Sequence, residues 1–178
     1  MRAKSLCICA AGFLLFAAAQ VPAQSQDRCS LPSGLRHEIS KKYPGLNVVT
    51  LADLDRYDRK LFLKDHGNRC PGFVKVNFYG DGKPTWAVLL ISREKSKPEA
   101  ELIVTQHVGK EWKTSSLETM DASPAPVVWR EGPGKYNDIS DPKTIRATSP
   151  VIVLCGYEAW ARLYAWTGKE VEMVRVSD

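Results

Sequence analysis

The sequence predicts an α+β fold in which two N-terminal helices pack on a mainly antiparallel sheet with a C-terminal β-hairpin. Apolar residues recur at helical spacing before residue 67 and at a period of two from Phe73 onward. Turn residues separate the predicted strands by short intervals. Such intervals favour antiparallel neighbours, because parallel neighbours need long crossover connections.

The first 23 residues are predicted to be a secretory signal peptide. Arg2 and Lys4 give a basic start, Leu6–Ala19 is apolar, and the small residues Val21 and Ala23 precede a cleavage site. The apolar run is shorter than the ~20 residues that span a bilayer, so cleavage is favoured over an uncleaved anchor. Residues 24–178 are then one domain, periplasmic or secreted and without a membrane span.

Two helices and a short strand are predicted before the sheet. Ser30–Pro44 is predicted to be the first helix, which the "YPG" at Tyr43–Gly45 ends, and Leu46–Thr50 is the strand. Thr50 and Asp53 have the spacing of a capping box. A capping box there would open the second helix, Leu51–His66.

The remainder of the chain is predicted to be strands and loops. Four consecutive strands are expected at Phe73–Tyr79, Thr85–Ser92, Glu101–Val108 and Glu111–Leu117. Residues 119–149 are rich in Pro, Gly, Ser and Asp, which predicts a short strand at Val127–Arg130 followed by a long loop. Pro150–Leu154 returns to strand character.

An aromatic face marks the C-terminal hairpin, in which residues 157–166 pair through a "TGKE" turn with residues 171–176. Trp160, Tyr164 and Trp166 share one face of its first strand. They are candidates for a carbohydrate platform or a protein-binding patch, because Trp and Tyr dominate binding hot spots. The alternative is that they form the core of the sheet, since large aromatic side chains carry much of a small domain's burial.

Three cysteines remain after signal cleavage: Cys29, Cys70 and Cys155. An exported protein with three cysteines is expected to form one disulfide and keep one thiol, and the sequence leaves all three pairings open. Cys155 follows the apolar run "VIVL", which favours a buried thiol over a nucleophile or an intermolecular bridge.

The charge pattern argues against nucleic acid as a partner. The formal net charge is +5, and removal of Arg2 and Lys4 with the signal peptide lowers it to +3. The basic residues are spread along the chain without a run that could follow a phosphate backbone.

No local catalytic motif is present, so the sequence predicts neither catalytic residues nor a cofactor. There is no G-x-S-x-G elbow, no S-x-x-K motif and no H-E-x-x-H zinc motif, and His37, His66 and His107 are widely spaced. An exported hydrolase stays an alternative if scattered residues meet in space. Its candidates are His66, Asp65, His107 and Asp138.

The segment "VNFYGDGKPTWAVLL" resembles the calcium loops of FG-GAP and related secreted repeats, D-x-D-x-D-G-x-x-D. The resemblance places Asn77, Tyr79, Asp81 and Thr85 at the carboxylate positions, and Asp81 alone keeps a carboxylate. It therefore implies a degenerate metal site at Asn77, Asp81 and Thr85, with a calcium-stabilised domain as a further alternative. More broadly, the chain resembles uncharacterised exported bacterial proteins, and that likeness implies no activity.

The function that the sequence favours is an exported, non-enzymatic binding or interaction domain. An inhibitor, an immunity-type protein and an envelope accessory protein all fit this description. The expected partner is a protein or a carbohydrate, which the sequence does not identify.

Overall fold

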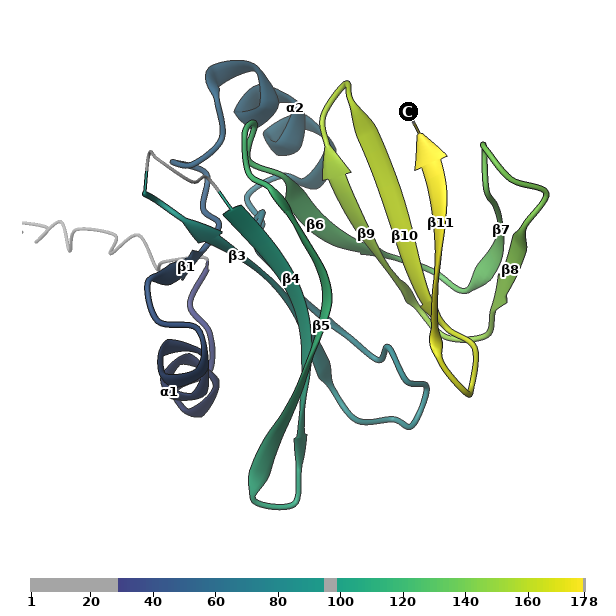
Figure 1. Cartoon of the computed structure of the whole chain (residues 1–178), viewed down its shortest axis with the longest axis horizontal. Coiled ribbons are helices and arrows are strands. Elements are labelled where there is room, and N and C mark those ends of the chain that lie inside the picture. Colours follow the sequence, from purple (N-terminus) through teal and green to yellow (C-terminus); the bar gives the residue numbers. More distant parts are fainter. Residues whose placement is uncertain (1–28, 95–98, 178) are drawn as a thin grey trace, which may run out of the picture.

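The computed structural model describes residues 29–94 and 99–177 of a chain that is mostly β. Its strands form two antiparallel sheets that face each other, here named sheet A and sheet B (Figure 1). The predicted signal peptide lies outside the described residues. None of the described helices is long and apolar enough to cross a membrane.

Sheet A contains the first five strands, in the order β1–β3–β4–β5, with β2 also paired to β3. The strands are β1 (Leu46–Val48), β2 (Phe73–Val76), β3 (Thr85–Ser92), β4 (Glu99–Val108) and β5 (Glu111–Asp121). The strands β1 and β2 pair with opposite halves of β3, so they lie end to end on one edge of the sheet.

Sheet B contains four strands in the order β11–β10–β9–β6. They are β6 (Val127–Glu131), β9 (Val151–Gly156), β10 (Trp160–Trp166) and β11 (Val171–Ser177). The strands β10 and β11 form the C-terminal hairpin, and a smaller hairpin joins β7 (Gly134–Asn137) to β8 (Thr144–Ala147).

The main core lies between the two sheets. Leu89 and Leu102 of sheet A belong to the same buried cluster as Ile152 and Leu154 of sheet B, and all four side chains are fully buried. Burial of each such side chain contributes about 1.5–3 kcal/mol relative to exposure.

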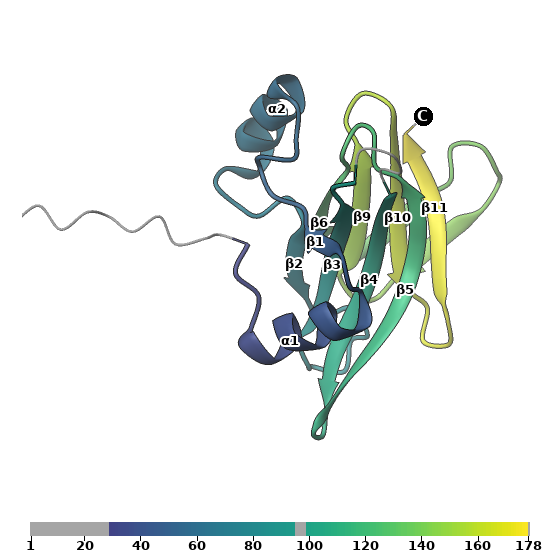
Figure 2. The ribbon, with the colours of Figure 1, turned by 60° about the vertical axis from the view of Figure 1, so that its left-hand side comes forward.

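Each outer face of the sandwich has its own cover (Figures 1 and 2). The helix α1 (Ser33–Lys42) packs Leu35 and Ile39 against the outer face of sheet A. The β7–β8 hairpin packs Ile145 against the outer face of sheet B. The helix α2 (Arg56–His66) contributes Phe62 to the core between the sheets.

The predicted α+β fold, with two N-terminal helices packed on one sheet, is therefore wrong. Of the two described helices, α1 alone covers a face of sheet A, and sheet B covers the other face of sheet A. All residues of β3 except Ser92 are buried, so the strand loses the alternation that would have distinguished a covered face from an exposed one. The hairpin β7–β8 also lies where a long loop was predicted.

The helix α2 begins five residues later than the capping-box pattern predicts. Asp55 is its N-cap, and the Asp55 carboxylate accepts hydrogen bonds from the backbone N–H groups of Tyr57 at 2.7 Å and Asp58 at 2.8 Å. Two orphan N–H groups at the helix start are thereby satisfied.

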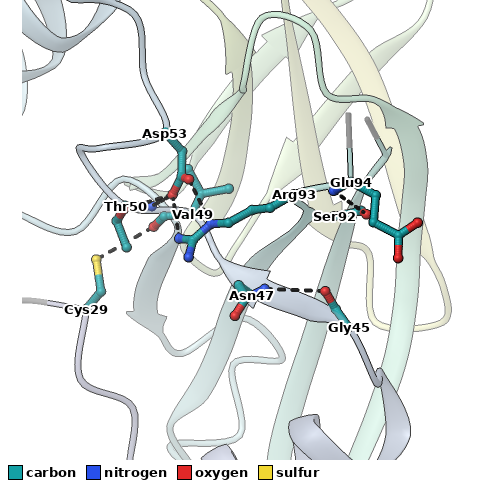
Figure 3. A network of polar contacts seen from close by, with 9 residues as sticks. All are labelled: Cys29, Gly45, Asn47, Val49, Thr50, Asp53, Ser92, Arg93 and Glu94. Atoms are coloured by element: carbon teal, nitrogen blue, oxygen red, sulfur yellow. Dashed lines mark hydrogen bonds and ion pairs between the residues drawn. The ribbon is translucent and has the colours of Figure 1, made fainter. Parts of the chain in front are cut away.

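Thr50 and Asp53 form a turn that is hydrogen-bonded to Arg93, the residue that follows β3 (Figure 3). The Asp53 carboxylate accepts from Thr50 N at 2.8 Å and from two Arg93 nitrogens at 3.0 and 3.1 Å. Although partial burial opposes the effect, the hydrogen bonds from Arg93 and Thr50 lower the pKa of Asp53 below its usual value. The carboxylate thus stays ionised and holds the segment before α2 against sheet A.

Gly72 allows the start of β2 to lie against the backbone that follows β1. A Cβ atom at this position would lie 2.4 Å from the carbonyl oxygen of Val49. Both segments bond to the same β3 residue, because Leu89 N donates to Gly72 O at 2.8 Å and Leu89 O accepts from Val49 N at 3.0 Å. The glycine of "CPG" is therefore required by close backbone packing.

Candidate functional site

A groove of about 760 Å³ runs along β2 at the edge of sheet A, and we name it the β2 groove. Residues 73–77 form one wall, and the turn at Gly82–Pro84 closes one end. Arg69, Lys75, Lys83 and Arg130 supply its charged side chains.

Four separate segments position these cations. Arg69 lies in the loop after α2, directly before the disulfide-bonded Cys70, and Lys83 lies in the β2–β3 turn. Lys75 projects from β2, where its ammonium lies 5.8 Å from the centroid of the Trp86 ring. Arg130 reaches across from β6, and its Nη1 donates to the carbonyl oxygen of Lys75 at 3.4 Å.

Among the described residues, no carboxylate lines the β2 groove. The nearby Asp81 carboxylate accepts from Gln106 at 3.1 Å and from Lys83 N at 2.9 Å, while Glu131 accepts from the Trp129 indole at 2.8 Å. Within residues 29–94 and 99–177, no ion pair includes any of the four cations. Although Lys83 interacts electrostatically with Asp81, the groove presents net positive charge, which attracts anions.

In the β2–β3 turn, two of the three residues of the predicted degenerate metal site already accept hydrogen bonds within the protein. Asn77 Oδ1 accepts from Gly82 N at 3.2 Å, and Asp81 makes the contacts given above. Thr85 is fully buried, and its hydroxyl has no partner within the described chain. The hydrogen bond from Lys83 N is the main cause that lowers the pKa of Asp81. No group of three or more His, Cys, Asp or Glu side chains in the described residues could hold a metal ion.

The aromatic face of β10 points into the space between the sheets. Tyr164 is 4% exposed and donates its hydroxyl hydrogen to Glu118 of β5, which also pairs with Arg162. Tyr164 therefore belongs to the core, as the alternative interpretation of the sequence expected, and is not a surface contact.

The two tryptophans of this face stay partly exposed at the margins of the same core. Trp166 stacks edge-on against Tyr79 at 5.2 Å between ring centroids, and the Arg162 guanidinium lies 4.7 Å from the Trp160 ring centroid. A binding role for Trp160 and Trp166 stays a prediction.

The three histidines, of which His66 and His107 are the hydrolase candidates, lie on different elements. His37 is exposed on α1, His66 stacks between Phe62 and Trp129, and His107 lies on β4. Burial is the main cause that lowers the pKa of His66, against a raising effect of the neighbouring Asp65.

Asp138, the remaining hydrolase candidate, is used in the packing of β11. Its carboxylate accepts from Arg175 N at 2.9 Å and from Ser140 N at 2.8 Å. The described structure thus gives no support to a site built from His66, Asp65, His107 and Asp138.

One of the three possible disulfides is formed. Cys29 and Cys70 are joined, with their Cα atoms 5.0 Å apart, and Cys155 is a free thiol on β9. Burial, with a smaller effect of Asp58, raises the pKa of Cys155 to about 11, so this thiol is protonated at neutral pH.

No known protein family, curated protein or solved structure matches this chain. Its site must therefore be interpreted from its own geometry.

None of the four cations of the β2 groove is among the site residues predicted from the sequence. They occupy positions 69, 75, 83 and 130, without a shared motif or spacing. The weak signal available was Lys75 within an otherwise apolar strand, beside a turn that carries Lys83.

Proposed function

We propose that this chain is an exported, non-enzymatic binding domain that uses the β2 groove to hold a negatively charged ligand. The observation that carries the proposal is the convergence of Arg69, Lys75, Lys83 and Arg130 on one groove, which no carboxylate of the described part of the chain lines. A volume of about 760 Å³ is within the usual range for ligand pockets.

The character of the cations supports binding rather than a structural role. All four residues are exposed and take part in no ion pair within the described residues, so the anionic groups of a ligand can reach them. Arg130 donates one hydrogen bond to a neutral carbonyl oxygen. A carboxylate or sulfate oxygen would accept a stronger, charge-assisted hydrogen bond from the same guanidinium.

Two further features support an exported domain without catalysis. The Cys29–Cys70 disulfide suits an oxidising compartment. The Cys155 thiol is protonated at neutral pH and so is not in its nucleophilic thiolate form.

Charge reversal in the groove tests the proposal. The Arg69→Glu/Lys83→Glu protein is compared with Lys110→Glu/Lys169→Glu, which makes the same change in net charge at exposed turns outside the groove. Binding of a fluorescein-labelled hexaglutamate peptide and of a polygalacturonate oligomer is measured by anisotropy at low salt.

We expect at least one probe to bind, and the groove variant to weaken its binding about tenfold or more, because each exposed charge pair contributes roughly 0.2–1 kcal/mol. The control variant should change binding less than threefold. Binding should also weaken in 0.5 M salt, since the Debye length falls well below ~10 Å. Equal losses in the two variants, or no binding of either probe, would overturn the proposal.

A further inference from the structure

The strand β2 is hydrogen-bonded as part of a sheet on one side only. It pairs with β3, and no second strand of the described chain forms a ladder with it. Figure 2 shows β2 at the outer edge of sheet A, with β6 of the other sheet behind it. The side of β2 away from β3 is approached by β6, whose Arg130 reaches the Lys75 carbonyl and lines the β2 groove.

The register with β3 identifies the backbone groups that point into the groove. In an antiparallel ladder, successive residues direct their N–H and C=O groups alternately toward and away from the partner strand. Gly72 points toward β3, because its carbonyl oxygen accepts from Leu89 N at 2.8 Å. Val74 and Val76 therefore also point toward β3, whereas Phe73 and Lys75 point away.

Two contacts from β6 agree with this alternation. Pro71 O accepts from Val128 N at 2.7 Å, and Lys75 O accepts from Arg130 Nη1 at 3.4 Å. Both carbonyls belong to the set that points away from β3. Within the described residues, the N–H and C=O of Phe73 and the N–H of Lys75 have no such partner. The edge therefore offers two N–H donors and one unoccupied acceptor, the Phe73 carbonyl, at the spacing of a strand, while Arg130 occupies the Lys75 carbonyl.

The side chains beside this edge select the kind of strand that could pair with it. Four cations favour acidic side chains, while the half-buried Phe73 and Val74 offer apolar contact. The same cations disfavour pairing with β2 of a second copy, because like charges would face each other.

We propose that the ligand of the β2 groove is an extended acidic peptide segment that adds to sheet A as a strand beside β2. The backbone of the segment bonds to Phe73 and Lys75, and its carboxylates pair with Arg69, Lys83 and Arg130. Arg130 exchanges the Lys75 carbonyl for a carboxylate, which frees that carbonyl for the added strand. This inference rests on the proposed function, since it specifies the ligand of the same groove.

A pair of probes separates strand addition from simple charge attraction. The first is an eight-residue peptide of alternating Glu and Val. The second is a peptoid with the same side chains, which keeps the charge and the carbonyls but has no backbone N–H. Affinities are measured by fluorescence anisotropy, and amide hydrogen exchange of the protein is followed by NMR in the presence of each probe.

We expect the peptide to bind at least tenfold more tightly than the peptoid. The peptide should slow amide exchange at Phe73 and Lys75 at least tenfold, while Val74 and Val76, already bonded to β3, change little. The Lys75→Pro and Lys75→Ala proteins lose the same charge, but only the proline removes the N–H. Lys75→Pro should therefore lose the preference for peptide over peptoid, and Lys75→Ala should keep it.

The outcomes distinguish this inference from the function on which it rests. Equal binding of peptide and peptoid, without slower exchange at Phe73 and Lys75, overturns strand addition and leaves an anion-binding groove. Binding of polygalacturonate but not of the peptide identifies a polysaccharide ligand and likewise overturns it. If no anionic probe binds, the proposed function fails together with the inference.

Discussion

Burial determines the chemistry of Cys155, the thiol that the disulfide leaves over. The residue lies on β9 opposite Ala161 of β10 and Val127 of β6, in a sheet whose neighbouring side chains are mostly apolar. Desolvation disfavours the thiolate, which is the reactive form. The surroundings of Cys155 therefore make it a packing residue.

Alkylation measures this effect directly. At pH 8 we expect iodoacetamide to modify Cys155 in the folded protein about 100-fold more slowly than in urea, because a pKa of about 11 leaves little thiolate. The rate should rise about tenfold per pH unit until the pH nears that value. A Cys155→Ser protein supplies the background, and equal rates in the folded and unfolded protein would contradict the assignment.

At the scale of elements, hydrogen bonds within the β2–β3 turn replace the ligands of a calcium loop. The loop keeps positive φ at Gly80 and Gly82, and Asn77 and Asp81 bond to its backbone. Gln106 of β4 ties Asp81 to the neighbouring strand. The turn is thus held by contacts that need no cation.

Calcium addition tests this account of the turn. We expect the melting temperature to be the same in millimolar calcium and in chelator. We also expect Asp81→Asn to lower it under both conditions, because the Gln106 and Lys83 contacts weaken. The Asp141→Asn protein, changed at an exposed turn, is the matched control. A rise with calcium that disappears in Asp81→Asn would instead establish the calcium-stabilised domain.

At the scale of the molecule, the Cys29–Cys70 disulfide joins the segment before α1 to the start of β2. The bridged residues are 41 positions apart and enclose α1, β1 and α2. Cross-linking a loop of this length reduces the entropy of the unfolded chain. It also fixes the backbone next to Arg69. The same disulfide therefore contributes to the stability of the fold and to the position of one cation in the β2 groove.

Removal of the disulfide should therefore affect both properties. We expect the Cys29→Ser/Cys70→Ser protein to lose about 4 kcal/mol of unfolding free energy, measured by urea denaturation. Where the variant still folds, its affinity for the acidic peptide should also fall, because Arg69 is held less firmly. The Cys155→Ala protein, which removes a thiol but keeps the bridge, should lose less stability and keep its affinity. An unaltered urea midpoint in the double variant would contradict the expectation.

The sequence by itself determined the local structure of this protein. Hydrophobic periodicity located α1, α2 and most strands, and the glycines with "TGKE" located the two turns that lead to β3 and β11. These features depend on residues a few positions apart. That is why α2 could be predicted while its cap, Asp55, was missed in favour of a competing pattern at Thr50 and Asp53.

Only the tertiary structure decided the layering, the disulfide partner and the candidate site. Periodicity shows that a side of a strand is buried but not what buries it. The sequence therefore predicted both helices as the cover of one sheet, where a second sheet covers one of its faces. Cys70 could have paired with either cysteine until the fold placed Cys29 beside it. The β2 groove unites the cations at positions 69, 75 and 83 with Arg130 from a distant strand, and no local pattern in the sequence predicts that convergence.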